Sequence, residues 1–134
     1  MIPGVEQIAP IAKRHGIILC LQFGSSVTGK VHERSDVDLA VLLERVPRSL
    51  QAHADLLRDL QRLFSDREVD LAILNRADPL FLRKIMEAPR LLYGSPRELQ
   101  RIKIYAFKRY QDHRRYLDME RRYVEGSLES RAPR

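Results

Sequence analysis

Two aspartates separated by one residue, Asp36 and Asp38, stand at the start of an apolar run that ends at Leu43. In an extended strand alternate side chains point to the same side, so both carboxylates project together while Val37 and Leu39 project to the other side. Like charges at that separation repel, and in apolar surroundings they are costly or take up a proton unless a cation lies between them. Mg²⁺ meets this need because it prefers oxygen ligands and commonly combines one or two carboxylates with substrate phosphates.

A third carboxylate recurs in the same setting further along the chain. The segment 68–74 repeats the order of acidic and apolar residues found in 36–42, and Asp70 takes the place of Asp38. If the two segments are neighbouring strands, three carboxylates converge at one edge of a sheet, as two-metal phosphoryl or nucleotidyl transfer requires. An isolated Asp-x-Asp is more often a solvated pair, and the recurrence at Asp70 favours a metal site.

A turn of small residues precedes the first acidic pair. Gly24 follows an apolar run, Ser25 offers a hydroxyl group, and residues 26–30 can begin a helical turn. The free backbone N–H groups of such a turn bind anions, so a phosphate group fits there. A Gly-Ser dipeptide alone is usually an ordinary turn. Its position between two predicted strands, with ten residues between Ser25 and Asp36, makes the combined pattern specific.

The elements that must position these residues follow from hydrophobic periodicity. We expect strands at Ile17–Phe23, Val37–Leu43, Glu68–Leu74 and Arg90–Tyr93, and helices at Val5–His15, Leu50–Phe64, Pro79–Met86 and Pro96–Glu125. Gly16 is placed to end the first helix, and Ser49 and Asp78 are placed to cap two later helices. The sequence therefore predicts an α+β fold, with a small mixed β-sheet flanked by helices and a long C-terminal helical segment.

Length and composition indicate one domain. The 134 residues suffice for one hydrophobic core, and 44% apolar with 31% charged residues is ordinary for a globular protein. We expect a single domain over residues 1–125, of which 96–125 is the helical segment, and a disordered tail over 126–134. The chain has no apolar run as long as a membrane span, and its N-terminus lacks the pattern of a secretory signal, so we expect a cytoplasmic protein.

Cysteine, histidine and overall charge carry weaker signals. Cys20 lies within an apolar run, where burial as a small hydrophobic residue is expected, and the four histidines lack zinc-ligand spacing. The net charge is +6, and ten of the 24 Lys and Arg residues fall within residues 100–134. This excess suits nucleotide phosphates, nucleic acid or an acidic protein, and a solvated helix face is the commonest explanation. We do not expect direct binding of nucleic acid.

The spaced pattern of Gly24-Ser25, Asp36-x-Asp38 and Asp70 resembles the signature of the DNA polymerase β-like nucleotidyltransferase superfamily. Over about residues 5–125 the short chain resembles the minimal nucleotidyltransferase (MNT) family, often the antitoxin partner of a HEPN-domain toxin. The resemblance implies that Gly24 and Ser25 contact the triphosphate of ATP. It implies further that Asp36, Asp38 and Asp70 are catalytic and hold two Mg²⁺ ions, with Asp70 also the candidate general base.

One position departs from the family pattern. Relatives often carry a basic residue where Thr28 stands, and Lys30 or Arg34 is the candidate phosphate contact in its place. A solvated loop charge is an equally good explanation of either residue. By resemblance, the implied reaction transfers AMP from ATP to a tyrosine of a cognate HEPN ribonuclease toxin, which neutralises the toxin.

The predicted C-terminal helix offers a docking surface for such a partner. Its aromatic residues are interleaved with arginines: Tyr105, Phe107, Tyr110, Tyr116 and Tyr123. We expect core packing to account for at least half of them. Two other functions stay open, namely transfer to a small molecule or an RNA end, and a non-catalytic antitoxin that neutralises its toxin by contact.

Overall fold

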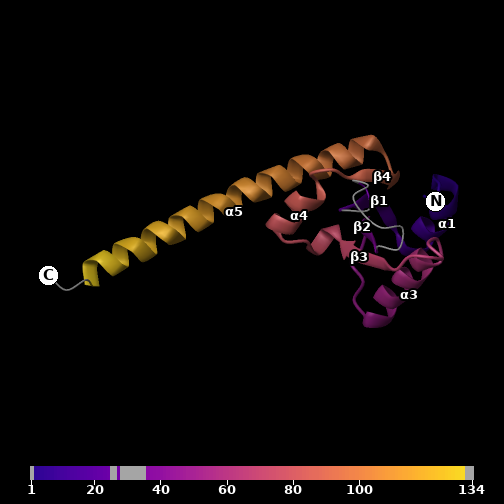
Figure 1. The fold of residues 1–134 in the computed structure, drawn as a ribbon, viewed down its shortest axis with the longest axis horizontal. Helices are drawn as coiled ribbons and strands as arrows, with labels where there is room; N and C mark the ends of the chain where they lie inside the picture. The colour runs from indigo at the N-terminus through magenta and orange to yellow at the C-terminus, as the bar shows by residue number, and fades with distance from the viewer. Residues whose placement is uncertain (1, 25–26, 28–35, 132–134) are drawn as a thin grey trace.

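The computed structural model describes residues 2–24, 27 and 36–131. Within them the strands form one sheet in the order β3-β2-β1-β4 (Figure 1). The strands are β1 (Ile17–Phe23), β2 (Val37–Leu43), β3 (Val69–Ile73) and β4 (Arg90–Tyr93). β1 pairs antiparallel with β2 and with β4, whereas β2 and β3 are parallel. The sheet is therefore mixed, which confirms the predicted fold class.

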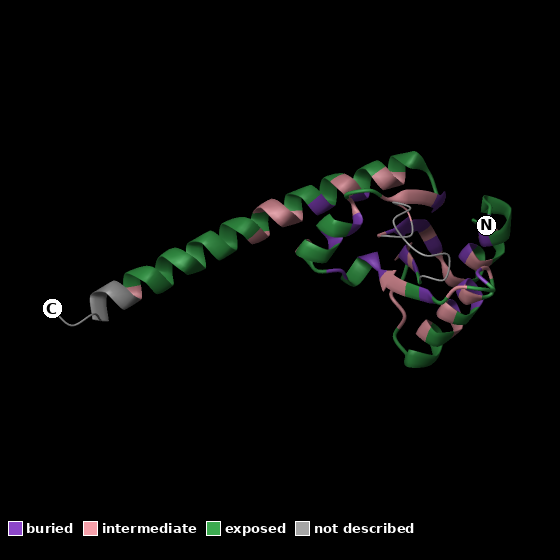
Figure 2. Ribbon diagram, viewed as in Figure 1, coloured by how far each residue is buried: buried purple, intermediate pink, exposed green. Residues whose placement is uncertain are grey.

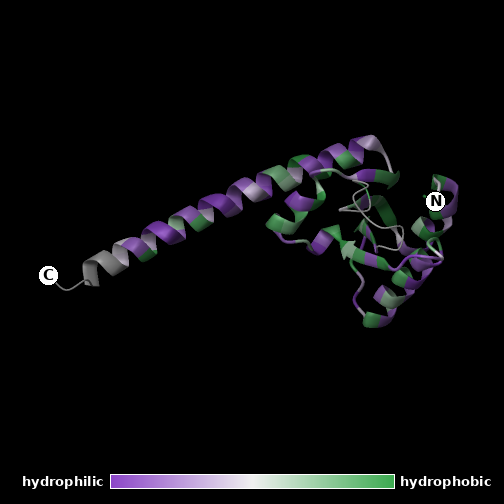
Figure 3. Cartoon of the chain, viewed as in Figure 1, coloured by the Kyte–Doolittle hydropathy of each residue, from purple (hydrophilic) through white to green (hydrophobic). Residues whose placement is uncertain are grey.

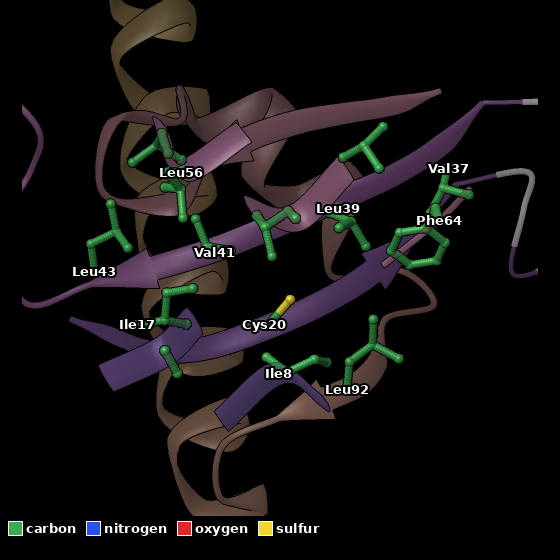
Figure 4. Close-up of a cluster of buried hydrophobic side chains, with 14 residues drawn as sticks. Ile8, Ile17, Cys20, Val37, Leu39, Val41, Leu43, Leu56, Phe64 and Leu92 are labelled. Carbon is green, nitrogen blue, oxygen red and sulfur yellow. The ribbon is translucent and has the colours of Figure 1, made fainter. Parts of the chain in front are cut away.

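Helices cover both faces of the sheet. The helices α1 (Val5–His15) and α3 (Leu50–Gln61) pack on one face, and α4 (Pro79–Ile85) with the first part of α5 (Pro96–Arg131) packs on the other. The apolar side chains of β2 that point toward α1 and α3 belong to the core shown in Figure 4: Val37, Leu39, Val41 and Leu43. Ala40 joins the core on the α4 side, so the alternation of the strand also directs Asp36 and Asp38 to that side.

Local interactions set the ends of the helices. The Ser49 hydroxyl accepts a hydrogen bond from the N–H of Ala52 at 3.1 Å, and the Asp78 carboxylate accepts one from the N–H of Phe81 at 2.9 Å. Gly16 ends α1 in the left-handed conformation, with φ of 68°. These three boundaries were predicted from the sequence and are confirmed.

The connection from α3 to β3 is organised by one side chain. The helix ends at Gln61, three residues before its predicted end at Phe64. The Gln61 amide group donates to the carbonyl oxygens of Phe64 and Arg67, and its oxygen accepts from the N–H of Val69 at 2.8 Å. These bonds compete with continuation of the helix and fix the start of the strand that carries Asp70. A short 3₁₀ helix, η1 (Leu74–Arg76), follows β3 where the sequence predicts no helix.

The helix α5 projects far beyond the rest of the fold (Figure 1). It is one continuous helix of 36 residues, which is about 54 Å long at 1.5 Å per residue. The helix continues through residues 126–131, where the sequence predicts a disordered tail over 126–134. Residues 132–134 lie outside the described part. Opposite charges four positions apart, as at Asp118 and Arg122, favour the extension.

The outer half of α5 is exposed and largely hydrophilic (Figures 2 and 3). Buried α5 residues such as Ile102 and Ala106 lie near its beginning, where the helix crosses the sheet and α4. In the part of the chain that the structure describes, no helix combines the length and apolar character of a membrane span. The outer half of α5 therefore lacks a core partner within the described chain.

Cys20 is buried in the core between the sheet and α1, as predicted (Figure 4). Burial raises the pKa of its thiol to about 12. Because the thiolate is the nucleophilic form of cysteine, Cys20 serves packing and not covalent chemistry.

Candidate active site

The parallel pairing of β2 with β3 sets Asp38 directly opposite Asp70. The register aligns Val37 with Val69 and Asp38 with Asp70. The N–H of Val37 also donates a hydrogen bond to the carbonyl oxygen of Glu68 at 2.8 Å, so the pairing begins at the first acidic residue of each segment. The two similar segments of the sequence are thus neighbouring strands, and the structure brings their carboxylates to one edge of the sheet.

The carboxylates repel one another across this edge. Asp36 and Asp70 are exposed, whereas Asp38 is half-buried. Partial burial raises the pKa of Asp38 above its ordinary value, and the negative charges of Asp70 and Asp36 raise it further. Lys84 on α4 lowers the pKa of Asp38, but this effect is the smallest of the four. Asp38 is therefore the centre of a negative site whose repulsion a bound cation would relieve.

Gly24 ends β1 against the same carboxylate. Its φ of 77° lies in the left-handed region, and its carbonyl oxygen accepts a hydrogen bond from the N–H of Val27 at 3.1 Å. A Cβ atom at Gly24 would lie 2.6 Å from Oδ2 of Asp38. The position therefore requires glycine both for backbone conformation and for the close approach of the carboxylate.

Four predicted residues of the connecting loop lie outside the described part of the chain: Ser25, Thr28, Lys30 and Arg34. The roles of Ser25, Lys30 and Arg34 in phosphate binding stay predictions, as does the effect of Thr28 in place of a basic residue. Gly24 and Asp36 are described and border the segment from its two ends.

A cavity of about 450 Å³ opens beside the carboxylates. Its lining combines sheet residues with residues of α4: Phe23, Gly24, Asp38, Asp70, Leu71, Ala72, Phe81 and Lys84. Phe81 packs edge-on against Phe23, with ring centroids 5.9 Å apart, and remains 38% exposed. One cavity thus offers acidic, aromatic and cationic groups, which suits a ligand that has an aromatic base and phosphates.

Sequence reasoning missed Phe81 and Lys84. The sequence predicts a short helix over Pro79–Met86 but not which of its faces meets the carboxylates, because that depends on packing between distant segments. In the structure Leu82 and Ile85 form the fully buried side of α4. Phe81 and Lys84 therefore face the cavity. Their spacing of three residues places them on one face of a helix and was the available signal.

The donor set fits Mg²⁺, although the described side chains do not form a complete metal site. Within residues 2–24, 27 and 36–131, no cluster of three or more His, Cys, Asp or Glu side chains could hold a metal ion alone. Carboxylate oxygens are the usual protein ligands of Mg²⁺, and nucleotide phosphates commonly complete its coordination. Partial burial and the negative charges of Asp70 and Asp36 together raise the pKa of Asp38, and this cost of ionisation favours a cation there. Metal binding by Asp36, Asp38 and Asp70 stays a prediction.

The acidic sheet edge and the glycine turn occur together in one known family. The family model described as "Polymerase beta, Nucleotidyltransferase" matches residues 6–98, which include all four described strands. The chain belongs to this nucleotidyltransferase family. The match ends at the beginning of α5, so the carboxylates, Gly24 and the cavity residues all fall within the nucleotidyltransferase domain.

The similarity of this nucleotidyltransferase to solved structures includes most of α5. A toxin-antitoxin structure with AMP-PNP has 23% sequence identity and a TM-score of 0.70, over 94% of this chain and 98% of that chain. A complex of a tri-AMPylated Shewanella oneidensis HEPN toxin with an MNT antitoxin has 21% identity and a TM-score of 0.64, over 92% of this chain and 93% of that chain. No curated protein matches the sequence. The long helix is therefore part of a shared fold and not an addition to it.

Proposed function

We propose that this nucleotidyltransferase is an antitoxin that transfers AMP from ATP to a tyrosine of a cognate HEPN ribonuclease toxin and thereby neutralises it. The observation that carries the proposal is the pairing of Asp38 with Asp70 across β2 and β3, beside the turn at Gly24. The likeness to two toxin-antitoxin structures supports this proposal. One contains an ATP analogue, which supports ATP as the donor, and the other a tri-AMPylated toxin, which supports the toxin as the acceptor. A cytoplasmic location, where ATP and Mg²⁺ are available, fits this reaction.

The proposed reaction assigns a separate task to each part of the site. Asp36 and Asp38, together with Asp70, hold two Mg²⁺ ions, which when bound neutralise the phosphates and activate the acceptor hydroxyl. Asp70 accepts the proton of that hydroxyl. The hydroxyl oxygen then bonds to the α-phosphorus, the bond from this phosphorus to the bridging oxygen breaks, and pyrophosphate leaves. The exposure of Asp70 suits this role because a protein acceptor must approach from solvent.

The exposed aromatic residues of α5 are an argument for a protein acceptor. Four of its five aromatic residues are exposed, by fractions of 48 to 77%: Tyr105, Phe107, Tyr116 and Tyr123. The expectation that core packing accounts for at least half of these aromatics is wrong: Tyr105 and Phe107 are exposed although they flank the buried Ala106, and the outer part of α5 extends past the sheet and α4 (Figure 2). Exposed aromatic residues interleaved with arginines are typical of protein interfaces. Tyr105, Tyr116 and Tyr123 recur at helical spacing on one face of α5, and we infer that this face contacts the toxin.

The reaction is tested with the purified chain, Mg²⁺ and the HEPN protein encoded beside its gene. ATP labelled at the α-phosphate should label the toxin, whereas ATP labelled at the γ-phosphate should not, because the β- and γ-phosphates leave together. Peptide mass spectrometry should find the added AMP on tyrosine. The Asp38→Asn variant should transfer no label, and Lys13→Gln, an exposed change on the opposite side of the sheet, should transfer it normally.

Other outcomes distinguish the alternatives. Label that appears on RNA or on a small molecule, and not on the HEPN protein, contradicts a protein acceptor. Neutralisation of the toxin by Asp38→Asn without label identifies inhibition by contact alone.

A further inference from the structure

We propose that the chain has a second anion site, at the end of the sheet opposite the aspartates, which binds a small ligand with several phosphate groups. Three arginines line one cavity of about 700 Å³ together with Val46: Arg45, Arg48 and Arg76. All three are exposed. None of these described residues lines the cavity beside Asp38. The ligand is therefore distinct from the nucleotide of the proposed transfer reaction.

The two parallel strands of the sheet separate the arginines from the carboxylates. Asp38 and Asp70 lie near the beginnings of β2 and β3. Arg45 and Arg76 follow the ends of the same two strands. The stretch of β2 from Asp38 to Leu43 spans roughly 17 Å at about 3.3 Å per residue. The arginine cavity and the acidic edge thus lie at opposite ends of the same pair of strands.

Side-chain hydrogen bonds hold together the two segments that carry the arginines. Nη2 of Arg76 donates to the carbonyl oxygen of Pro47 at 2.8 Å, which joins η1 to the loop after β2. The amide oxygen of Asn75 accepts from the N–H of Leu43 at 3.0 Å, and the amide nitrogen of Asn75 donates to the carbonyl oxygen of Leu43 at 2.8 Å. The walls of the cavity are therefore fixed against each other without a ligand.

The charge of this cavity is not balanced within the described part of the chain. None of the ion pairs between described residues includes one of the three arginines. The carboxylates nearest to them in sequence make other contacts. Glu44 lies beside Gly16, and Asp78 accepts the hydrogen bond that caps α4. Three like charges thus line one hollow, and an anion bound among them would relieve their repulsion.

The class of ligand follows from three guanidinium groups around one hollow. A guanidinium group binds phosphate or carboxylate oxygens through paired N–H donors, and three such groups match a ligand that carries several negative charges. A single carboxylate of a protein partner would neutralise one arginine only. An extended RNA strand needs a longer basic surface, whereas Glu44 and Asp78 flank the arginines in sequence. A small oligophosphate or a phosphate ester with several phosphate groups fits this cavity best.

The test uses the whole chain in EDTA, where the carboxylates at the other end of the sheet hold no Mg²⁺ and repel anions. Inorganic tripolyphosphate is titrated by calorimetry into the wild type, the double variant Arg45→Gln and Arg48→Gln, and the control double variant Arg114→Gln and Arg115→Gln. The control removes the same amount of charge from exposed positions of α5. The fold should tolerate all four substitutions, because each residue is exposed.

We expect tripolyphosphate to bind the wild type at a single site. The double variant in the cavity should weaken this binding at least about tenfold, and the control should change it less than about twofold. Inorganic phosphate should bind the wild type at least about tenfold more weakly than tripolyphosphate, because it reaches fewer of the guanidinium groups.

Three results would overturn the proposal. Absence of tripolyphosphate binding to the wild type excludes the site. Equal weakening in the two double variants identifies attraction by net charge alone. Tighter binding of a short single-stranded RNA or a glutamate-rich peptide than of tripolyphosphate, lost in the variant of the cavity, assigns the arginines to a macromolecule instead. Toxin labelling plays no part in these titrations, so the transfer reaction is tested independently.

Discussion

Asp38 lies opposite Asp70 in the parallel register of β2 and β3, on the side of the sheet that faces α4. Side chains that are paired in this way usually stabilise a sheet, but two carboxylates destabilise it. The raised pKa of Asp38 reflects this conflict. The free chain therefore retains a local repulsion whose relief depends on ligand binding.

The Asp38→Asn variant should unfold at a higher temperature than the wild type in EDTA at neutral pH. The folded pKa of Asp38 exceeds its unfolded value of 3.8, so ionisation costs stability once the pH rises through 3.8, and the asparagine removes that loss. Solvent screening limits the gain to about 1 kcal/mol or less. Thermal denaturation at pH 3 and pH 7 measures it, and the advantage should shrink at pH 3. A lower melting temperature of Asp38→Asn in EDTA would contradict a net cost of ionising Asp38 in the folded protein.

The Asp59→Asn variant should lose stability for the opposite reason. Asp59 on α3 is buried and lies 2.6 Å from Nε2 of His15, which joins α3 to α1. The hydrogen bond with His15 is the largest effect that lowers the pKa of Asp59, with Arg14 and Arg62 contributing. The folded pKa lies below the unfolded value, so this stabilisation is present above about pH 3.8 and disappears as the pH falls through the folded pKa.

Urea denaturation at pH 7 should show a loss of about 1–3 kcal/mol for Asp59→Asn. Asp55→Asn is the matched control, because Asp55 lies on the same helix but is half-exposed and contacts its helix neighbours, Arg58 at 3.6 Å and Gln51 at 3.0 Å. Its change should stay below about 0.5 kcal/mol. Equal losses at the two positions would exclude a particular role for the contact with His15.

The Gly24→Ala variant should abolish transfer. The new Cβ would meet Oδ2 of Asp38 at 2.6 Å, and a φ of 77° disfavours alanine by about 1–2 kcal/mol. Toxin labelling and AMP-PNP titration should both show the loss. Gly126→Ala is the control, because Gly126 lies in α5 with no atom within 4 Å of its added Cβ. That change should raise helix stability slightly and leave transfer intact.

The double variant Tyr116→Ala and Tyr123→Ala should bind the toxin more weakly but bind the nucleotide as the wild type does. Both residues are exposed on the half of α5 that projects beyond α4, and no described residue of α5 lines the cavity beside the aspartates (Figure 1). We expect toxin affinity to fall at least about tenfold, as for aromatic interface residues, while AMP-PNP binding stays unchanged. Leu50→Ala is the control, because Leu50 is an exposed apolar residue at the start of α3. Unaltered toxin affinity in the double variant would exclude this face of α5 as the docking surface.

The sheet edge could be predicted from the sequence because its signals are local. The alternation around Asp36 and Asp38 and its repeat at Asp70 predict strands, and the same alternation aligns the carboxylates once the strands pair. The bounds of α1, β1, β2 and β4 agree with the prediction. Gly24 was predicted from its turn. Its close approach to Asp38 depends on how distant segments pack and could not be predicted.

The missed features depend on tertiary contacts. The helix α3 ends early because the Gln61 side chain bonds to the following connection, which no periodicity reveals. Phe81 and Lys84 reach the cavity because Leu82 and Ile85 are buried, which depends on where α4 packs. The tail was expected to be disordered because its apolar periodicity ends, whereas α5 continues to Arg131, where opposite charges four positions apart can support a polar helix.

The helix α5 divides into a part that belongs to the fold and a part that does not. Substitutions at Ile102 and Ala106 change core packing, whereas those within residues 116–126 alter exposed side chains. The outer turns can therefore accumulate mutations without lowering the stability of the domain or displacing the aspartates. Substitutions in these turns can change the choice of partner among related chains. The reaction at the sheet edge then stays the same.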